Sequence, residues 1–521
     1  MASNQVPAEL MGCRDSDIDF DEDVPKELVE IDTAAEEAPP QEPTAPEPTV
    51  MDQLAIFLSE QRATSAEMLR AVPAEKVLER CGTHLWSQKR STSQKAELFE
   101  HSKPVTSIDE FWSHSWHGRQ RWKVWCLLYV KNAWPALFVS TATAALVALL
   151  FAFELLPGWV KTSNYAPPEP HAYGAWGCWT GVLTYLLMII LWKPRADVFV
   201  DLFCIHQANP RLKAEGLLSI GAILKNSESM LLLWDDTYLK RLWCVFELAG
   251  FLRSHQAQGR LVIKPTILGP ATFWNVIAIT FVVSTDLVFS GIPGGSVTRF
   301  LLVFITTCAV AWPILVWRRG MVTLKRQLAE FTFAKTVCHC CMRGHIDDNG
   351  GPIECDRELL GTSICNWFGS VDEFDNLVRS DVEAELKKQL AVSPFGYTWV
   401  LHAGVPILWA QGFDKAAAIF RHGDVLWSLA IFISGLAWYF LVIPINFGTL
   451  ELFAARMDRL ALGWGCRSTA LLLICQCCVY LSSHLSYYAC FETLPTPLLA
   501  VLVHSACAVL VFVLVWNCKK R

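Results

Sequence analysis

Residues 197–251 read DVFVDLFCIHQANPRLKAEGLLSIGAILKNSESMLLLWDDTYLKRLWCVFELAGF, and this stretch decides the fold of the chain. It alternates short apolar runs, as expected for buried parallel strands, with longer segments of helical spacing. Helices are expected over 211–225 and 236–254. The expected strands are residues 108–116, 197–202, 229–234 and 261–267. This order of strand and helix predicts an α/β domain with a parallel sheet and right-handed crossovers.

Three groups of polar and aromatic residues follow the expected strands. The first strand leads into Ser113-His114-Ser115-Trp116, and the second leads into an Asp-x-x-Cys-Ile-x-Gln pattern. The third strand is preceded by Ser227 and followed by Tyr238 and a Trp-Cys-x-x-Glu-Leu motif. The residues of the last two groups are Asp201, Cys204, Ile205 and Gln207, then Ser227, Tyr238, Trp243, Cys244, Glu247 and Leu248.

With these motifs, residues 105–270 resemble the Toll/interleukin-1 receptor (TIR) superfamily, including its fungal heterokaryon-incompatibility relatives. The resemblance implies a flavodoxin-like fold that self-associates. Some members cleave NAD with the glutamate of the Trp-Cys-x-x-Glu-Leu helix, which makes Glu247 the candidate catalytic residue. By the same resemblance, the substrate and loop candidates are Ser113, Trp116, Asp201, Gln207, Tyr238, Trp243 and Cys244. The chain departs from the family because two apolar spans separate its first two strands.

Structural roles compete with these assignments. Glu247 is also placed to form a helix-surface ion pair with Arg241 or Lys240. Trp243 and Cys244 have the spacing of core residues. Asp235 and Asp236 suit a metal ion, but acidic residues at the start of a helix are favourable in themselves.

Apolar runs of membrane-spanning length surround the α/β stretch. A helix needs about 20 apolar residues to cross the hydrocarbon region of a bilayer. Eight runs are candidates, of which the fifth is the weakest: 134–157, 174–192, 272–292, 300–317, 396–412, 426–447, 468–491 and 494–516. Residues 448–467 are expected to form an amphipathic helix on the membrane face.

Basic residues set the expected topology. Lys193, Arg195, Arg318 and Arg319 flank the even-numbered spans, and the positive-inside rule places these ends in the cytosol. Eight spans also put the tail 518–521 inside, so both termini are expected to be cytosolic, in a membrane that the sequence does not identify. The fifth run is alternatively re-entrant, which would leave seven spans.

Composition agrees with a multi-pass membrane protein. The 521 residues are 53% hydrophobic and 18% charged, and the net charge is −6. Residues 1–49 are rich in Pro and hold fourteen of the 50 Asp and Glu residues against two basic residues, and they are expected to be disordered because they have too little apolar surface to fold. The remainder is net basic, as suits contact with anionic lipid. No basic stripe with interleaved aromatic residues predicts nucleic-acid binding.

A segment rich in cysteine and histidine lies between the fourth and fifth spans. Cys338 and Cys341 have the two-residue separation of a zinc ligand pair, His345 follows them, and either Cys355 or Cys365 is a candidate to complete a four-ligand set. The competing interpretation is that these are reduced cysteines of a Cys-rich chain, since free cysteine behaves as a small buried hydrophobe.

The sequence thus predicts a mixed architecture, a helical membrane bundle carrying a cytosolic TIR-type domain. A signalling or assembly role through self-association is the leading hypothesis. One alternative is a membrane-tethered hydrolase with NAD as substrate, and another is a transporter or channel that uses the in-membrane acids Glu154 and Asp286. The expected segments are 1–49 (tail), 50–104 (short helices), 105–133 and 193–270 (α/β domain), 134–192 and 272–317 (membrane hairpins), 318–395 (Cys/His segment), 396–517 (spans five to eight) and 518–521 (basic tail).

Overall fold

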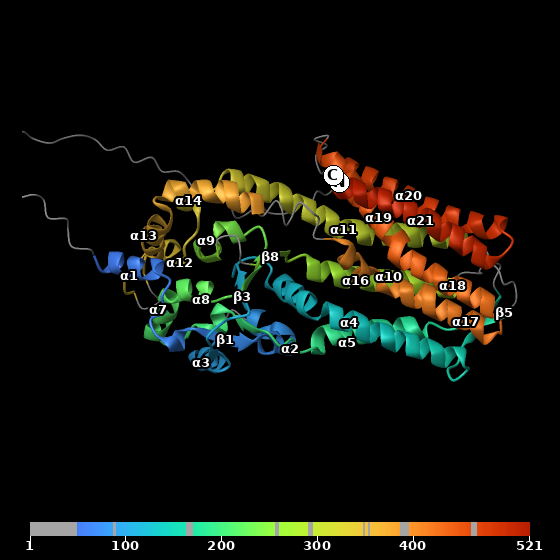
Figure 1. Ribbon diagram of the computed structural model, residues 1–521, viewed down its shortest axis with the longest axis horizontal. Coiled ribbons are helices and arrows are strands. Elements are labelled where there is room, and N and C mark those ends of the chain that lie inside the picture. Colours follow the sequence, from blue (N-terminus) through green and yellow to red (C-terminus); the bar gives the residue numbers. More distant parts are fainter. Residues whose placement is uncertain are drawn as a thin grey trace, which may run out of the picture. The chain divides into compact units, whose positions relative to one another are not determined.

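Figure 1 shows a computed structural model of the protein. It describes residues 49–86, 90–162, 170–255, 260–289, 295–346, 350–352, 355–385, 395–459 and 466–520. Of the predicted acidic tail only Thr49 lies within this part. Its hydroxyl accepts a hydrogen bond from the backbone N–H of Asp52 and caps the first helix.

A six-stranded mixed sheet forms the α/β part, in the order β2-β1-β6-β3-β7-β8. The four strands from β6 to β8 are parallel, and β1 pairs antiparallel with both β6 and β2. The strand bounds are β1 Arg70–Pro73, β2 Lys103–Pro104, β3 Glu110–His114, β6 Asp197–Phe199, β7 Ser229–Trp234 and β8 Arg260–Pro265. All four predicted strands are present, and β7 coincides with its predicted range because five of its six residues are buried.

Short helices connect the parallel strands after β6. Asn209 caps one of them by accepting from the N–H groups of Arg211 and Leu212, and Pro210 fills its first turn. The helix that follows β7 buries its predicted inner face, including Leu242, Val245 and Phe246. The bounds are α6 Asp201–Cys204, α7 Pro210–Leu218, α8 Ile220–Lys225, η2 Tyr238–Lys240 and α9 Leu242–His255.

Residues 50–104 contain strands as well as the expected helices. Met68 lies in a 3-10 turn and Val72 in β1, whereas their spacing indicates one helical face. The pairing of β1 with β2 and β6 explains this difference, because a short strand between two neighbours takes its structure from them. The helices of this region are α1 Val50–Ser59, η1 Ala66–Met68, α2 Ala74–Trp86 and α3 Thr92–Glu100.

Five described helices are long and apolar enough to cross a membrane, by length and composition. They are Gln120–Ala152, Leu268–Thr285, Val425–Met457, Thr469–Thr493 and Pro497–Cys518. The corresponding elements are α4 Gln120–Ala152, α10 Leu268–Phe289, the continuous series α18 Val425–Ala437, η6 Trp438–Val442 and α19 Ile443–Arg459, then α20 Cys466–Thr493 and α21 Pro497–Lys520.

Eight crossings are therefore not supported by the same criteria. The helix α5 (Trp176–Leu191) has only 16 residues, and α11 (Gly295–Ala329) has several residues whose side chains lie outside the described part. The weak fifth run forms the first part of a helix that includes a π-helical turn and is mostly buried in the bundle. Its elements are α16 Tyr397–Ile407, η5 Leu408–Asp414 and α17 Lys415–Arg421.

The expected interfacial helix 448–467 is also different in the structure. Residues 448–459 continue η6 without a break as part of α19, and Leu450 and Ala454 are fully buried. Residues 460–465 lie outside the described part. This segment therefore prolongs a long helix of the bundle.

The Cys/His segment, predicted over 318–395, begins inside α11, and its own helices follow the end of α11. Its helices pack against the α/β part, since Trp367 stacks on Phe246 of α9 with ring centroids 4.8 Å apart. Trp367 also donates to the backbone oxygen of Ser59 in α1, with an N···O distance of 2.8 Å. The elements are η3 Phe333–Lys335, α12 His339–Met342, α13 Asp356–Phe368, α14 Val371–Leu377 and η4 Val378–Val382.

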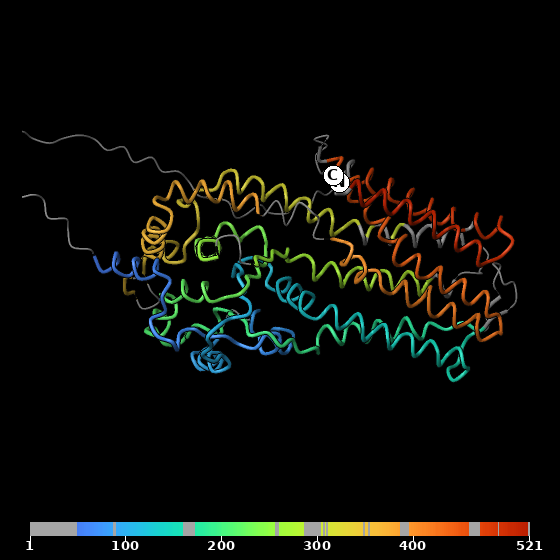
Figure 2. Tube along the Cα trace, in the orientation of Figure 1, coloured from blue at the N-terminus to red at the C-terminus, as the bar shows by residue number. Residues whose placement is uncertain are grey.

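The sheet and the long helices share one hydrophobic core. Figure 2 shows α4 as a single coil that leaves the sheet region and continues among the long helices. A small hairpin, β4 Trp159–Thr162 and β5 Pro170–Tyr173, connects α4 to α5. Where α10 passes α4, a side chain at Gly269 would lie 2.2 Å from the backbone carbon of Trp125, so the two helices meet backbone to backbone.

Candidate functional site

Glu247 lies on α9 beside the carboxyl end of β3. The hydroxyl oxygen of Ser113 is 2.6 Å from Glu247 Oε2 and 2.7 Å from the hydroxyl of Tyr238. Tyr238 donates to the backbone oxygen of Cys244 over 3.0 Å. Ser113 therefore donates its hydroxyl proton to Glu247 and holds the carboxyl group in place beside Tyr238.

The surroundings of Glu247 raise its pKa. Burial raises the pKa of Glu247 to about 8, and the nearby negative charge of Asp201 adds to the rise, while the hydrogen bond from Ser113 opposes it. A buried carboxyl group with a pKa near neutral pH is a common property of catalytic acids and bases, although structural networks also produce it.

Asp201 accepts hydrogen bonds from two other predicted loop residues. Its Oδ2 accepts a hydrogen bond of 2.7 Å from the indole nitrogen of Trp116. Its backbone oxygen accepts a bond of 3.1 Å from the side-chain amide of Gln207. Asp201 follows β6 and Trp116 follows β3, so both lie where the parallel strands end. The carboxyl edge of a parallel sheet is the usual ligand site in such folds.

The first turn of α4 adds a group that sequence reasoning missed. The amino group of Lys123 lies 3.1 Å from Asp235 Oδ2, and only 2% of the lysine side chain and 10% of the aspartate side chain are exposed. Lys123 also donates to the backbone oxygens of Ser115 and His117. Its position before the first apolar run gives no sign of a buried partner after β7, more than a hundred residues later.

A small cavity lies beside this edge. Its volume is about 10 Å³, and His114, Gln120 and Lys123 are among its lining residues. Such a volume holds about one water molecule. The Nε2 atom of His114 is buried with no hydrogen-bond partner in the described ranges, so a water in this cavity would satisfy it. Glu247 does not line the cavity.

The structural roles considered for this region are now distinguishable. Glu247 bonds to Ser113, and within the described part of the chain it has no ion pair with Arg241 or Lys240. Cys244 is buried and Trp243 is half-buried, and the Trp243 indole donates to Asp356 Oδ2 of the Cys/His segment over 3.1 Å. Asp235 binds Lys123 and Thr237, which accounts for its charge without a metal ion.

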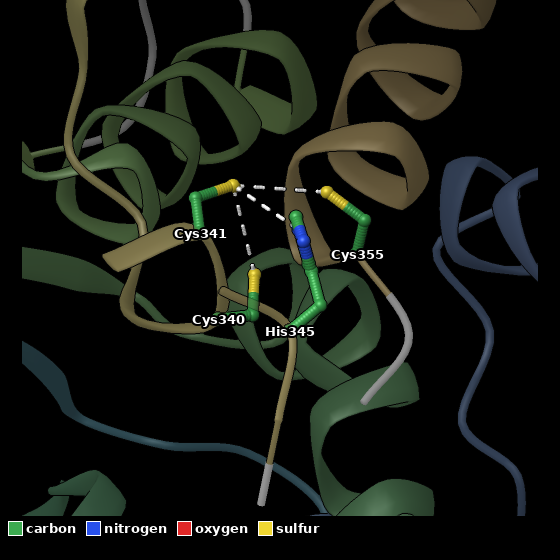
Figure 3. Close-up of side chains that lie close together, drawn as sticks. All are labelled: Cys340, Cys341, His345 and Cys355. Atoms are coloured by element: carbon green, nitrogen blue, oxygen red, sulfur yellow. Dashed lines mark hydrogen bonds between the residues drawn. The ribbon is translucent and has the colours of Figure 1, made fainter. Parts of the chain in front are cut away.

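The Cys/His segment forms a second cluster. One side-chain atom from each of Cys340, Cys341, His345 and Cys355 lies within 4.8 Å of every other, and Figure 3 shows these side chains converging. Three of them belong to the predicted zinc set. The fourth ligand differs, because Cys340 stands where the spacing suggests Cys338. Cys338 instead joins a neighbouring group with Cys340 and Asp356.

The acids expected inside the membrane have other surroundings. Glu154 follows the end of α4, is 68% exposed and has Arg421 as a partner 3.9 Å away. The side chain of Asp286 lies outside the described residues. Asp414, which sequence reasoning missed, is buried and accepts 2.8 Å hydrogen bonds from the N–H groups of Gly177 and Cys178 at the start of α5. The transporter hypothesis stays a prediction.

Comparison with known proteins adds no relative to this picture. No protein-family model, no curated protein and no solved structure matches the chain.

Proposed function

We propose that the protein is a multi-pass membrane protein whose TIR-like α/β domain has a signalling role and assembles with the domains of other copies. Taken in chain order, its parallel strands β3, β6, β7 and β8 lie second-first-third-fourth across the sheet, as in the flavodoxin-like folds. Glu247, Ser113 and Tyr238 lie beside β3 and β7, where the direction of winding reverses. This order supports the resemblance seen in the motifs.

The observation that carries the proposal is the junction between this edge of the sheet and the bundle. Lys123 of α4 pairs with Asp235 after β7. Trp317 of α11 packs edge-on against Trp234 at the end of β7, with ring centroids 5.6 Å apart. Long helices therefore contact the same strand ends that position Glu247. A change of conformation at this edge would be transmitted to the bundle, as signalling requires.

Loop charge supports a cytosolic location for the domain. Lys193 and Arg195 precede β6, and Arg318 and Arg319 lie in α11 on the way to the Cys/His segment. The positive-inside rule places such residues in the cytosol. We infer that both termini share this side, which requires an even number of crossings.

Assembly is tested by cross-linking mass spectrometry on the full-length protein in lipid vesicles, with an isotope-labelled copy to mark links between chains. We expect links between copies at Lys213, Lys225 and Lys240, which are exposed on the α/β domain. A membrane protein that does not associate gives only the level of cross-links that random encounters between copies produce. Links confined to the bundle, or no links above background at high density, would overturn assembly through this domain.

A second candidate function is the cleavage of NAD, favoured by the position of Glu247 beside the carboxyl ends of β3 and β7. A carboxylate at this place would stabilise an oxocarbenium-like ribosyl centre. The small cavity at this edge gives it no support, because Glu247 does not line that cavity and its volume holds only about one water molecule.

NAD consumption by the full-length protein decides between the two functions. Wild type is compared with Glu247→Gln and with the control Glu228→Gln, whose side chain is exposed. Cleavage by wild type and the control, with loss in Glu247→Gln, would establish the hydrolase. No cleavage by any of them at high density would leave Glu247 as a structural residue of an assembly domain.

A further inference from the structure

We propose that Cys340, Cys341, His345 and Cys355 form a tetrahedral Zn²⁺ site that fastens the Cys/His segment to α9. The site does not depend on the proposed signalling function. Three cysteines and one histidine are a common ligand set for structural zinc. All four residues come from α12, the turn after it and the residue that precedes α13.

The distances between the ligand atoms agree with one zinc ion. Zn–S bonds of about 2.3 Å and Zn–N bonds of about 2.0–2.1 Å place tetrahedral ligands about 3.5–3.8 Å apart. The sulfur of Cys341 lies 3.5 Å from His345 Nε2, 3.8 Å from the sulfur of Cys355 and 4.0 Å from that of Cys340. These sulfurs are too far apart for a disulfide bond of about 2.05 Å.

The backbone is shaped to bring the ligands together. Gly344 and His345 both have positive φ, 62° and 59°, so the chain reverses sharply after α12. A left-handed backbone is uncommon outside glycine, although histidine adopts it more often than most residues. The N–H of His345 donates to the backbone oxygen of Cys340 over 2.9 Å and closes this turn. Bonding of its imidazole to a metal ion would stabilise the turn further.

Binding is an exchange of protons for metal. Zn²⁺ forms bonds to three sulfurs and one imidazole nitrogen, the three thiol protons go to solvent, and His345 stays neutral. The filled site then carries one negative charge. Cys338, with its sulfur 3.1 Å from that of Cys340, is placed to donate its S–H to the Cys340 thiolate, as an outer-shell partner does.

The consequence for the α/β domain follows from the neighbours of the cluster. Asp356, next to the ligand Cys355, accepts the hydrogen bond from Trp243 at the start of α9. Val337, three residues before Cys340, pairs with Arg241 in a short parallel bridge. One ion would therefore stabilise two contacts at the start of α9, the helix that carries Glu247. These are the hydrogen bond from Trp243 and the bridge at Arg241.

The test measures metal content of the full-length protein, purified in detergent under reducing conditions and exposed to Zn²⁺ alone. We expect one zinc ion per wild-type chain, and loss of the ion in Cys341→Ser and Cys355→Ser. Cys365→Ser is the matched control, because Cys365 lies on α13 outside the cluster, and it should keep its zinc. Cys338→Ser should also keep it, whereas Cys340→Ser should not.

Two outcomes would overturn the proposal. A wild-type chain that binds no stoichiometric zinc contradicts the site, and loss of zinc in Cys338→Ser with retention in Cys340→Ser contradicts the ligand set. If the serine variants fail to fold, Co²⁺ is bound to the wild type instead. Tetrahedral thiolate coordination gives an intense visible spectrum, and its absence would be decisive against the site. Chelation of zinc from the wild type should also speed hydrogen exchange in residues 338–345 and in α9.

Discussion

At the scale of single residues, the burial of Glu247 makes the stability of the fold depend on pH. Its pKa is about 8 in the folded protein, against an ordinary value of 4.5. The folded state therefore holds a proton that the unfolded state releases, and stability falls as the pH rises from about 4.5 through 8. We expect Glu247→Gln, which keeps an acceptor for Ser113 but cannot ionise, to melt close to wild type at pH 5 and at a higher temperature at pH 8.5.

The comparison is made by thermal unfolding in detergent across this pH range. Glu228→Gln serves as the control, because its exposed side chain should give a difference from wild type that does not change with pH. A constant difference for Glu247→Gln as well would mean that the carboxyl group ionises in the folded protein as it does in solution.

Individual residues also show how far the sequence could be interpreted. Ser113, Tyr238 and Glu247 could be selected as site candidates through the resemblance of their motifs, and the pairing of β3 with β7 brings them together. Lys123 could not be assigned, because its partner Asp235 becomes its neighbour only when β3 and β7 pair. Spacing selected Cys338 as a zinc ligand, whereas the turn at Gly344 and His345 brings Cys340 into the cluster.

At the scale of elements, the crossing of α4 and α10 depends on a glycine. A methyl group at Gly269 would lie 2.2–2.4 Å from backbone atoms of Trp125 and Cys126, and backbone cannot move aside as a side chain can. We expect Gly269→Ala to lower stability by at least about 1–3 kcal/mol, the usual cost of overpacking. In Gly320→Ala the new methyl group meets only the Trp234 ring at 3.4 Å, so unfolding of that variant should resemble wild type.

The short helix α5 depends on a cap from another helix. Asp414 accepts from the N–H groups of Gly177 and Cys178, and this end of α5 is buried. Leaving a buried donor unpaired costs about 1–3 kcal/mol. We therefore expect melting temperatures to fall in the order wild type, Asp414→Asn, Asp414→Ala. The comparable cap of α18, where Asp424 accepts from the N–H of Trp427, is half-exposed, so Asp424→Ala should cost less. Equal losses at the two caps would contradict the role of burial.

The sequence predicted secondary structure well where every residue of a segment is buried. It did so less well where packing against neighbouring segments decides the structure. The run at 229–234 is apolar throughout and forms β7, whereas Arg70–Pro73 has no strand pattern and is ordered by pairing with β6. Residues 448–459 have an amphipathic pattern that indicates an interfacial helix. Their apolar side packs inside the bundle, because α19 continues η6 and is covered by its neighbours.

At the scale of the whole molecule, the ion pair between Lys123 and Asp235 joins the sheet to the bundle. Both side chains are almost fully buried, so Lys123→Met would leave Asp235 charged and unpaired at the junction. Breaking a buried pair in this way costs about 3–5 kcal/mol, whereas replacing both partners is often nearly neutral. We expect Lys123→Met to melt well below wild type and Lys123→Met with Asp235→Leu to recover much of the loss. The shared core predicts that the α/β domain and bundle of the double variant unfold together, which hydrogen exchange of β7 and α4 would show. If instead the single variant released only the domain, while α4 kept its wild-type exchange, the junction would be a contact between independent parts and could not transmit a signal.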